Sequence, residues 1–353
     1  MNAARIGRAL APASISAALL LALAAPQALA AAAYTAHNLV SDGGVLAAHR
    51  DKNLVNGWGL AFGPGPAWVA DTGTGKSTVY DGNGTVLPLV VTIPKGAPTG
   101  IVFNGTSGFV VRSGAKSGAS LFIFDSEAGV VSGWSPGVSP TSAVAAFTAK
   151  DGAIYKGLAL ARQGAAAFLY ATDFHNGKVD VLDSGFKLTK AQGGFKDPTL
   201  PKGFAPFGIG NVGGKLVVTY AKQDAAREDD VHGKGLGFVD LFDAQGHLLK
   251  RLASRGALNA PWGVALAPKG FGPLGGALLV GNFGDGTING YDPVSGAARG
   301  GLLAGGKRLV VDGLWGLSFG NGAATQPKNT LFFAAGPADE SHGLYGRIDV
   351  SGQ

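Results

Sequence analysis

The chain has 353 residues, a formal net charge of +6 and no cysteine. Spread over this length, the positive charge is too small to indicate nucleic-acid binding, which usually shows a basic face or stripe. The absence of cysteine excludes a disulfide framework and a lipid-anchored lipoprotein. A chain of this size buries enough apolar surface to fold without disulfides.

Residues 1–33 have the pattern of a secretory signal rather than of a folded segment. Its parts follow in order: Arg5 and Arg8, the Ala/Leu-rich residues 15–23, and the small-x-small sequence Ala28-Leu29-Ala30. We expect cleavage after Ala30 to Ala33, which would leave a secreted or periplasmic domain of residues 34–353. No other apolar run approaches about 18 residues, the length of a spanning helix, so no membrane association is expected after cleavage. A retained N-terminal anchor is the alternative.

Six repeats of about 50 residues fill most of the remaining chain. In each repeat a glycine opens a short apolar run and an aspartate closes another run downstream. The glycines are Gly59, Gly100, Gly157, Gly208, Gly263 and Gly316. The aspartates are Asp81, Asp125, Asp183, Asp243, Asp292 and Asp349. Repeats of this length made of short β-rich runs indicate the blades of a β-propeller.

The first repeat shows the expected content of one blade. Its four runs, separated by Gly, Pro and Asn turn residues, are residues 59–62, 68–71, 77–81 and 86–93. This pattern predicts a four-stranded antiparallel sheet, whose strands we name A to D with A innermost. In the second repeat, similar spacing places the end of strand B at Arg112 and the B–C connection at residues 112–120. The predicted fold is an all-β, six-bladed propeller of residues 34–353.

The two ends of this domain are predicted to pair. The sixth repeat ends after its third run, Gly346 to Val350, whereas residues 34–41 form a strand-like run before the first repeat. Propellers commonly close their ring with a strand from the other terminus, which also removes an exposed edge. We therefore expect residues 34–41 to form the outer strand of the sixth blade. A frayed terminus is the alternative.

The sequence of the repeats resembles that of six-bladed propellers of the NHL type. A closer likeness rests on the segments HNLVSD (37–42), NLVNGWGLAF (53–62), YAKQDA (220–225), GNFGDGTING (281–290) and GPADESHG (336–343). These segments resemble an uncharacterised family of exported bacterial propeller proteins. The resemblance implies a fold and an exported location, but no established activity.

The loops are where ligand chemistry is expected. In a propeller the D–A and B–C connections emerge on one face, around the mouth of the central channel, and polar groups can converge there. The fourth B–C connection is long, because the end of strand C at Asp243 follows the end of strand B at Tyr220 by 23 positions, where short blades have 10. Its predicted ligand-binding residues are Asp224, Arg227, Glu228, Asp229, Asp230 and His232. The alternative is a solvated insertion whose charges keep it soluble.

Other polar loop residues are candidates for acid–base or metal chemistry. Two B–C loops pair a carboxylate with a histidine, and the catalytic candidates are His175, His342 and Glu340. The oxygen-bearing candidates for a metal, with Ca²⁺ the ion considered, are Asn56, Asp71, Asp173, Asn282, Asp285 and Asp312. Two alternatives compete. An aspartate after strand B often caps its own turn, and residues 282–286 are equally typical of a tight hairpin.

Two further patterns are interpreted structurally. Aromatic residues precede four of the repeat glycines, namely Trp58, Phe207, Trp262 and Trp315. They are expected to pack between blades, although such rings can also stack a sugar or an aromatic ligand. Residues 316–320 match the G-x-S-x-G motif of hydrolases, but Ser318 falls inside an expected inner strand, with no strand-to-helix turn to expose it.

Two functions remain open. The first is a binding scaffold that presents its B–C loop face to a small molecule, a glycan or a protein, and we expect it to be monomeric. The second is a divalent-metal-dependent hydrolase of the lactonase or esterase type, with its site at the channel mouth. Gluconolactonase-type propellers hold their metal partly through a Glu before the first inner strand. This chain has only Glu127, Glu228 and Glu340, none at that place, which favours the binding scaffold.

Overall fold

The computed structural model describes residue 1, residues 34–323 and residues 325–351. From residue 34 onward the described residues form six small antiparallel sheets arranged in a ring, which confirms the predicted six-bladed β-propeller. The predicted signal segment lies outside the described residues, apart from Met1. The only helices in the described part of the chain are the short 3-10 turns η1 (Thr72–Thr74) and η2 (Gly272–Leu274), and neither is long and apolar enough to cross a membrane.

The blades follow one another along the chain, and their strands run in the order A to D. Blade 1 consists of β3 (Gly57–Phe62), β4 (Ala67–Asp71), β5 (Lys76–Tyr80) and β6 (Val91–Thr92). Blade 2 consists of β7 (Pro98–Phe103), β10 (Phe122–Ser126), β11 (Val130–Trp134) and β12 (Val144–Thr148). Blade 3 consists of β13 (Tyr155–Gln163), β14 (Ala166–Asp173), β15 (Lys178–Leu182) and β16 (Leu188–Thr189).

The second half of the ring has the same order, with small additions. Blade 4 consists of β17 (Phe204–Val212), β18 (Lys215–Gln223), β20 (Phe238–Phe242) and β21 (Leu248–Ser254), with β19 (Asp230–Val231) paired to β18. Blade 5 consists of β22 (Pro261–Leu266), β23 (Leu278–Asn282), β24 (Ile288–Tyr291) and β25 (Ala298–Gly301). Blade 6 consists of β28 (Leu314–Phe319), β29 (Leu331–Ala335), β30 (Leu344–Val350) and β1 (Tyr34–Ser41), with β2 (His49–Arg50) beside β1. A small hairpin of β26 (Leu303–Ala304) and β27 (Lys307–Arg308) precedes blade 6.

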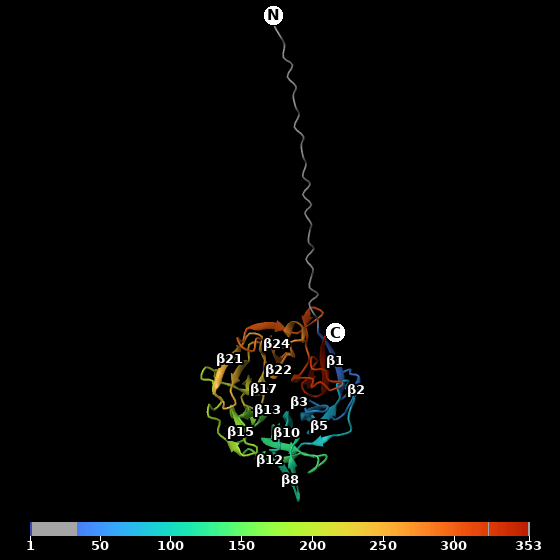
Figure 1. Cartoon of the computed structure of the whole chain (residues 1–353), viewed down its shortest axis with the longest axis vertical. Helices are drawn as coiled ribbons and strands as arrows, with labels where there is room; N and C mark the ends of the chain where they lie inside the picture. Colours follow the sequence, from blue (N-terminus) through green and yellow to red (C-terminus); the bar gives the residue numbers. More distant parts are fainter. Residues whose placement is uncertain (2–33, 324, 352–353) are drawn as a thin grey trace. The chain divides into compact units, whose positions relative to one another are not determined.

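In Figure 1, β3, β13, β17 and β22 surround the centre of the ring, whereas β2, β12, β15 and β21 lie at its rim.

Burial explains why strand B is so apolar. All five residues of β4, β23 and β29 are buried, because each blade is covered by a neighbour on both faces. Strands buried on both faces read as continuous apolar runs rather than as an alternation of apolar and polar residues. The absence of alternation in these segments is therefore a consequence of the blade packing.

The repeat glycines mark the contact between neighbouring inner strands. A Cβ atom on Gly59 would lie 2.4 Å from the Thr99 carbonyl oxygen of the next blade, and one on Gly208 would lie 2.1 Å from the Trp262 carbonyl oxygen. The same clash with the next blade's backbone occurs at Gly100, Gly263 and Gly316, and a tight contact occurs at Gly157. Glycine inside a strand is typical of such a close backbone approach. The glycine that recurs about every 50 residues is thus required sterically where one inner strand passes the next.

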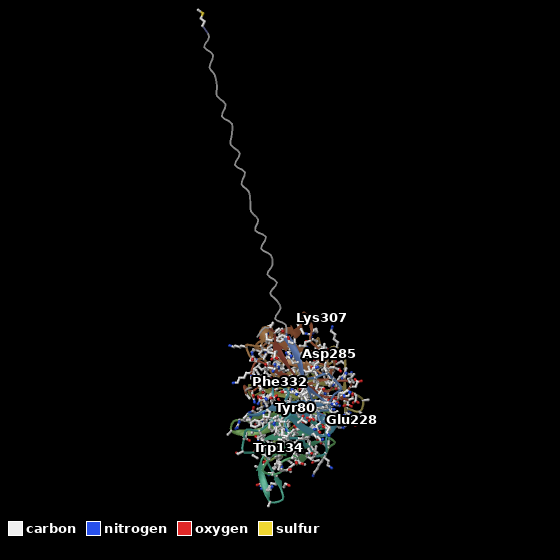
Figure 2. All side chains as sticks on the ribbon, turned by 90° about the vertical axis from the view of Figure 1, so that its right-hand side faces the viewer. Tyr80, Trp134, Glu228, Asp285, Lys307 and Phe332 are labelled. Atoms are coloured by element: carbon white, nitrogen blue, oxygen red, sulfur yellow. The ribbon has the colours of Figure 1, made fainter. Side chains whose placement is uncertain are left out.

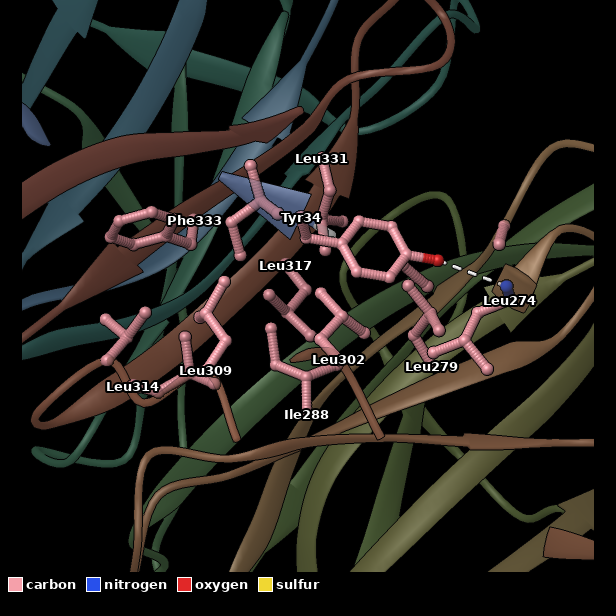
Figure 3. Close-up of a cluster of buried hydrophobic side chains, with 14 of the residues drawn as sticks. Tyr34, Leu274, Leu279, Ile288, Leu302, Leu309, Leu314, Leu317, Leu331 and Phe333 are labelled. Atoms are coloured by element: carbon pink, nitrogen blue, oxygen red, sulfur yellow. Dashed lines mark hydrogen bonds between the residues drawn. The ribbon is translucent and has the colours of Figure 1, made fainter. Parts of the chain in front are cut away.

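The ring closes as predicted. Strand β1 pairs antiparallel with β30, from Tyr34 opposite Val350 to Ser41 opposite Leu344. The Tyr34 hydroxyl also donates to the Phe271 carbonyl oxygen (3.0 Å) and accepts from the Leu274 backbone N–H (3.1 Å), as Figure 3 shows for Leu274. The N-terminal strand therefore completes blade 6 and fastens it to blade 5.

The prediction for the second repeat was wrong in its strand order. Residues 112–120 belong largely to the hairpin of β8 (Val110–Ser113) and β9 (Lys116–Ala119), which is inserted between strands A and B. Strand A pairs directly with β10, with Phe103 opposite Phe122. An A–B connection emerges on the face opposite the B–C loops, so this hairpin does not contribute to the predicted site face. The B–C connection of blade 2 is the short turn that contains Glu127.

Candidate functional site at the channel mouth

Aromatic side chains close the central channel from the side where the A strands begin. Trp58, Trp262 and Trp315 come from different blades and contact one another, together with the rings of Phe174 and Phe207. These side chains are buried, as a packing role predicts, but they meet one another across blades that are not neighbours, such as Trp58 of blade 1 and Trp262 of blade 5. We call this cluster the aromatic plug.

A ring stack extends from the plug toward the mouth. The Trp315 ring lies between Trp58 (ring centroids 3.8 Å apart) and Phe283 (3.7 Å apart), and both pairs are stacked. Both faces of Trp315 are therefore covered, and the His232 and Phe283 rings meet in a T-shaped contact with centroids 5.0 Å apart. A ligand at the mouth meets these rings mainly along their edges.

A pocket of about 230 Å³ lies at the mouth, over the plug. We call it the mouth pocket. It is lined by Trp58, Lys156, Asp229, Asp230, His232, Phe283, Trp315, Asp339 and Glu340. These residues come from blades 1, 3, 4, 5 and 6, either from the start of strand A or from a B–C loop. The polar side chains thus converge on the face where the sequence predicted a ligand site.

A second cavity of about 420 Å³ lies along the inner strands beyond the plug. Its lining is apolar or backbone, and its polar side chains are Asn211 and Ser318. Ser318 lies within strand β28, and its hydroxyl donates only weakly to the Phe319 carbonyl oxygen (3.4 Å). The G-x-S-x-G match is therefore not a nucleophile elbow, and this cavity offers no charged group for chemistry.

Lys156 is the central cation of the mouth pocket. Its side chain is 2% exposed, its Nζ atom donates to Glu127 and to Asp229 Oδ1 (3.1 Å), and it lies 5.3 Å from the centre of the Trp58 ring. Burial favours the neutral amine, but the Glu127 and Asp229 carboxylates outweigh it and raise the pKa of Lys156. The side chain therefore stays an ammonium and is not a nucleophile near neutral pH.

From the sequence, Lys156 was expected only as one of the polar residues that the D–A connections bring to the mouth, with no binding or catalytic role, although the sequence contains a further signal for it. It precedes Gly157, at the place where four other repeats carry an aromatic residue before the glycine. In the structure this position points toward the axis, and the Lys156 carbonyl oxygen accepts the indole N–H of Trp262 (2.7 Å). Lys156 therefore places a charged group at the aromatic plug, in the position before the repeat glycine where four other repeats have an aromatic residue.

Glu340 enters the pocket from a strained B–C loop of blade 6. Three successive non-glycine residues, Ala338, Asp339 and Glu340, have left-handed backbone angles, with φ of 55°, 50° and 63°. Left-handed backbone costs about 1–2 kcal/mol for each ordinary residue, and it persists only where surrounding contacts hold it. Here Asp312 Oδ2 accepts the Ala338 backbone N–H (2.9 Å). Strain of this kind is concentrated at functional sites.

Asn56 connects this loop to the aromatic plug. Its Nδ2 atom donates to Glu340 Oε1 (2.9 Å), and its Oδ1 atom accepts the indole N–H of Trp315 (3.1 Å). Burial raises the pKa of Glu340, and the hydrogen bond from Asn56 opposes this only in part. A carboxyl with a raised pKa at a pocket wall can hold a proton closer to neutral pH than a free glutamate.

The long loop of blade 4 covers another side of the pocket. The pairing of β18 with β19 places Gln223 opposite Asp230, and the Gly233 backbone N–H donates to Asn259 Oδ1 (2.6 Å). His232 Nε2 lies 2.9 Å from Asp230 Oδ2, and this interaction, opposed by burial, raises the pKa of His232. The loop is thus attached to blades 4 and 5.

The structure divides the predicted ligand-binding residues into two groups. Asp229, Asp230 and His232 line the mouth pocket, whereas Asp224, Arg227 and Glu228 do not. The Asp224 carboxylate accepts the backbone N–H groups of Glu228 (2.9 Å) and Asp229 (3.4 Å), so it closes the loop on itself. Glu228 is exposed (Figure 2).

The catalytic candidates are also separated. Glu340 lines the mouth pocket, whereas His175 and His342 do not. His342 Nδ1 lies 2.8 Å from Asp42 Oδ2, which attaches the blade 6 loop to the segment after β1. The His175 ring nitrogen Nδ1 is buried and has no hydrogen-bond partner within the described part of the chain.

The six candidate metal ligands are not brought together. Asp173 accepts from Ile154 and Asn176, so it caps its own turn, and Asn282 and Asp285 hydrogen-bond each other within a hairpin. The Asp71 carboxyl is fully buried inside blade 1, where burial raises its pKa well above the usual value. Asn56 and Asp312 hold the blade 6 loop, as described above. Among residues 34–323 and 325–351, no three histidine, aspartate or glutamate side chains form a group that fits a metal ion.

Comparison with known proteins gives the family. No protein-family model matches the sequence. Two proteins of Acanthamoeba polyphaga mimivirus are similar over nearly the whole chain. Uncharacterized protein R648 is 33% identical over 88% of this chain and 78% of its own length, and Uncharacterized protein L690 is 32% identical over 90% and 86%. The chain belongs to the family of these mimivirus proteins. These relatives are viral, so the expectation that the family is bacterial is not supported.

Solved structures of similar fold carry several activities. A streptogramin B lyase covers 90% of this chain with 97% of its own (TM-score 0.53, 12% identity). A gluconolactonase from Xanthomonas campestris covers 84% with 87% (TM-score 0.52, 13% identity), and a glucose dehydrogenase covers 90% with 100% (TM-score 0.53, 14% identity). At these identities the likeness shows the propeller fold alone.

Proposed function

We propose that the protein binds a small organic molecule in the mouth pocket. The observation that carries this proposal is a single cavity lined by residues from five blades, above an aromatic plug. Its polar groups come from blades 1, 3, 4 and 6, and they are the buried Trp58 indole and Lys156, the half-buried Asp230 and Glu340, and the exposed Asp229, His232 and Asp339. One of these groups lacks a partner. The Trp58 side chain is 3% exposed, and its buried indole N–H donates to no group in the described part of the chain. A buried donor without a partner costs about 1–3 kcal/mol, which a ligand oxygen would offset.

The size of the pocket favours a compact ligand. Sites for drug-sized molecules usually measure about 300–1,000 Å³, and the mouth pocket is smaller, at about 230 Å³. The long loop of blade 4 and the strained loop of blade 6 both contribute lining residues, so the opening has walls rather than a flat surface. These features support a small molecule over a glycan chain or a protein surface. Export of the domain stays a proposal that rests on residues 1–33.

The alternative is a divalent-metal-dependent hydrolase at the same mouth. One protein of similar fold is described as a gluconolactonase, but at 13% identity the likeness supports the fold and not this activity. Five of the six candidate oxygen ligands serve turn caps and loop contacts in different blades, and Asp71 is fully buried inside blade 1, so they do not fit a shared Ca²⁺ ion. The donor set therefore favours binding over metal-assisted hydrolysis.

Tryptophan fluorescence offers a direct test, because Trp58 and Trp315 line the pocket. The full chain would be titrated with a panel of small sugars, polyols, amines and hydroxy acids, with thermal unfolding measured in parallel. A native-state ligand raises the unfolding midpoint by mass action and should also change the emission. The change should be reduced in Trp58→Phe, which leaves Trp315 at the pocket, and kept in Trp134→Phe, whose tryptophan lies in blade 2. Failure of every compound, or a response unaffected by Trp58→Phe, would contradict the proposal.

A further inference from the structure

The charge of the mouth pocket differs in sign from that of the chain. The chain has a net charge of +6, yet four carboxylates line this pocket beside one lysine and one histidine. Local excess of one charge in a walled site attracts ligands of the opposite charge. The lining therefore selects for a positive ligand in a protein that is otherwise basic.

Pairing within the pocket shows which carboxylates are free for a ligand. Asp229 is paired with Lys156, and Asp230 is paired with His232. Asp339 and Glu340 form no ion pair within the described residues, and both line the pocket from the strained loop. The Glu340 carboxyl uses one oxygen for Asn56 Nδ2, and the structure gives its second oxygen no hydrogen bond within the described chain. Two adjacent carboxylates without an ion-pair partner are thus presented to the cavity, where the charge of Lys156 acts on Glu340 and both carboxylates act on His232 from a greater distance.

We infer that the ligand of the mouth pocket is a small organic cation that also carries a hydroxyl or carbonyl oxygen. This inference rests on the proposed function. Its positive group would lie against Asp339 and Glu340, and its oxygen would accept the unpartnered indole N–H of Trp58. An anionic ligand would face four carboxylates, and a neutral one would leave Asp339 and Glu340 without an ion-pair partner.

The existing arrangement of Lys156 shows that this mouth already holds an ammonium group. Its Nζ atom is bound by the carboxylates of Glu127 and Asp229, which come from the B–C connections of blades 2 and 4. Asp339 and Glu340 are the corresponding carboxylates of blade 6. The Trp58, Trp315 and Phe283 rings stack on one another, and Lys156 and His232 pack against the two ends of this stack. Charge pairing is therefore the basis of recognition, rather than contact of the cation with an open ring face.

The test uses probes of matched shape and different charge. Choline is compared with its neutral carbon isostere 3,3-dimethylbutan-1-ol, and ethanolamine is compared with neutral ethylene glycol and anionic glycolate. Binding to the full chain is measured at pH 7 by calorimetry and by the shift of the unfolding midpoint. We expect each cation to bind at least tenfold more tightly than its neutral partner, and glycolate to bind least.

Variants locate the effect. Asp339→Asn and Glu340→Gln remove one charge each with little change of shape, and asparagine tolerates the left-handed backbone well. Each should weaken cation binding at least tenfold without reducing the already weak binding of the neutral probes. Glu228→Gln is the control, because it removes a charge from the same loop face without lining the pocket. Trp58→Phe should weaken cationic and neutral probes alike.

The outcomes separate the two proposals. Equal or tighter binding of the neutral or anionic probes would overturn the cation inference while leaving a small-molecule site in place. Cation binding that persists in both carboxylate variants would also overturn it. If none of these probes and no compound of the wider panel changes fluorescence or stability, both the inference and the proposed function fail.

Discussion

Asn56 and Glu340 are joined by a 2.9 Å hydrogen bond between the first blade and the last, 284 residues apart in sequence. The same Asn56 side chain accepts the indole N–H of Trp315, so a single amide links the strained loop to the aromatic plug. Asn56 itself has a left-handed backbone, with φ of 49°. The bond therefore acts both in closing the ring and in shaping the pocket.

Replacing Asn56 with aspartate should break this link. Asn56→Asp keeps the acceptor for Trp315 and tolerates the left-handed backbone, but it loses the donor to Glu340 and adds a like charge. We expect a loss of about 2 kcal/mol in the free energy of unfolding at pH 7. Denaturant titration would measure it, with the exposed Asn83→Asp as a control expected to change stability by less than about 0.5 kcal/mol.

The pH dependence of this variant gives a second check. Burial raises the pKa of Glu340 in the folded state, so ionising this group weakens the fold. The penalty is absent below the unfolded pKa of a glutamic acid and complete above the raised folded pKa. The loss in Asn56→Asp should therefore shrink as the pH falls through this range. A loss that stays constant down to pH 3 would argue against like-charge repulsion as its cause.

The repeat glycines predict a steep position dependence for alanine substitution. At Gly208 a new Cβ atom would lie 2.1 Å from a backbone oxygen of the next inner strand, which only a backbone shift can relieve. Gly208→Ala should cost about 3 kcal/mol, at the upper end for overpacking. Gly65→Ala is the control, since a Cβ atom there meets nothing within 4 Å. Similar stability of the two variants in thermal unfolding would refute the steric account of the repeat.

Much of the fold could be predicted from the sequence because its causes are local and repeated. Each inner strand needs a glycine where the next strand passes, and residues 34–41 supply the strand missing from the sixth repeat. The strand order of the second repeat was wrongly predicted because residues 109–111 are apolar and resemble a strand B. The run that ends at Asp125 and Ser126 is the true strand B, and only its pairing with β7 reveals this.

The site was less predictable because its contacts join distant loops. Charge density marked the whole blade 4 loop, but it could not tell Asp229, which reaches Lys156, from Asp224, which closes its own turn. The partners of Lys156 lie 29 and 73 residues away, so no local pattern shows them. What the sequence does show is a lysine at a repeat position that is aromatic in four other repeats, and this exception indicates a site residue.

A buried carboxyl in blade 2 should make stability depend on pH. Asp125 is fully buried, and burial raises its pKa to about 7. Because the folded state then binds a proton that the unfolded state has released, the stability should fall as the pH rises from about 4 to about 7. Asp125→Asn keeps the acceptor for the Gly100 N–H and cannot ionise. The variant should match the parent at pH 4 and be more stable by a few kcal/mol at pH 8 in urea titrations. A difference that is the same at both values would contradict the raised pKa.

Divalent ions separate the two candidate functions. Because the candidate oxygen ligands lie in different blades, where Asp71 is fully buried and the others serve turns and loops, we expect the unfolding midpoint of the full chain to stay within about 1 °C when EDTA or millimolar Ca²⁺ is added. An ion that binds only the native state must raise the midpoint. A clear rise, abolished by Asp285→Asn, would instead support the metal-dependent hydrolase and justify assays with lactones and esters.

The last prediction concerns Lys156, whose buried ammonium group pairs with the carboxylates of Glu127 and Asp229 at the mouth. Lys156→Met keeps the length of the side chain but leaves Glu127 and Asp229 without their cation. Breaking a buried ion pair costs about 3–5 kcal/mol, and the partial exposure of both carboxylates should reduce this to about 2 kcal/mol. Adding Glu127→Gln should restore part of the loss, whereas the exposed Lys187→Met should have little effect. If Lys156→Met were as stable as the parent in denaturant titrations, the ammonium would contribute nothing to the mouth, and the carboxylates would tolerate one another without it.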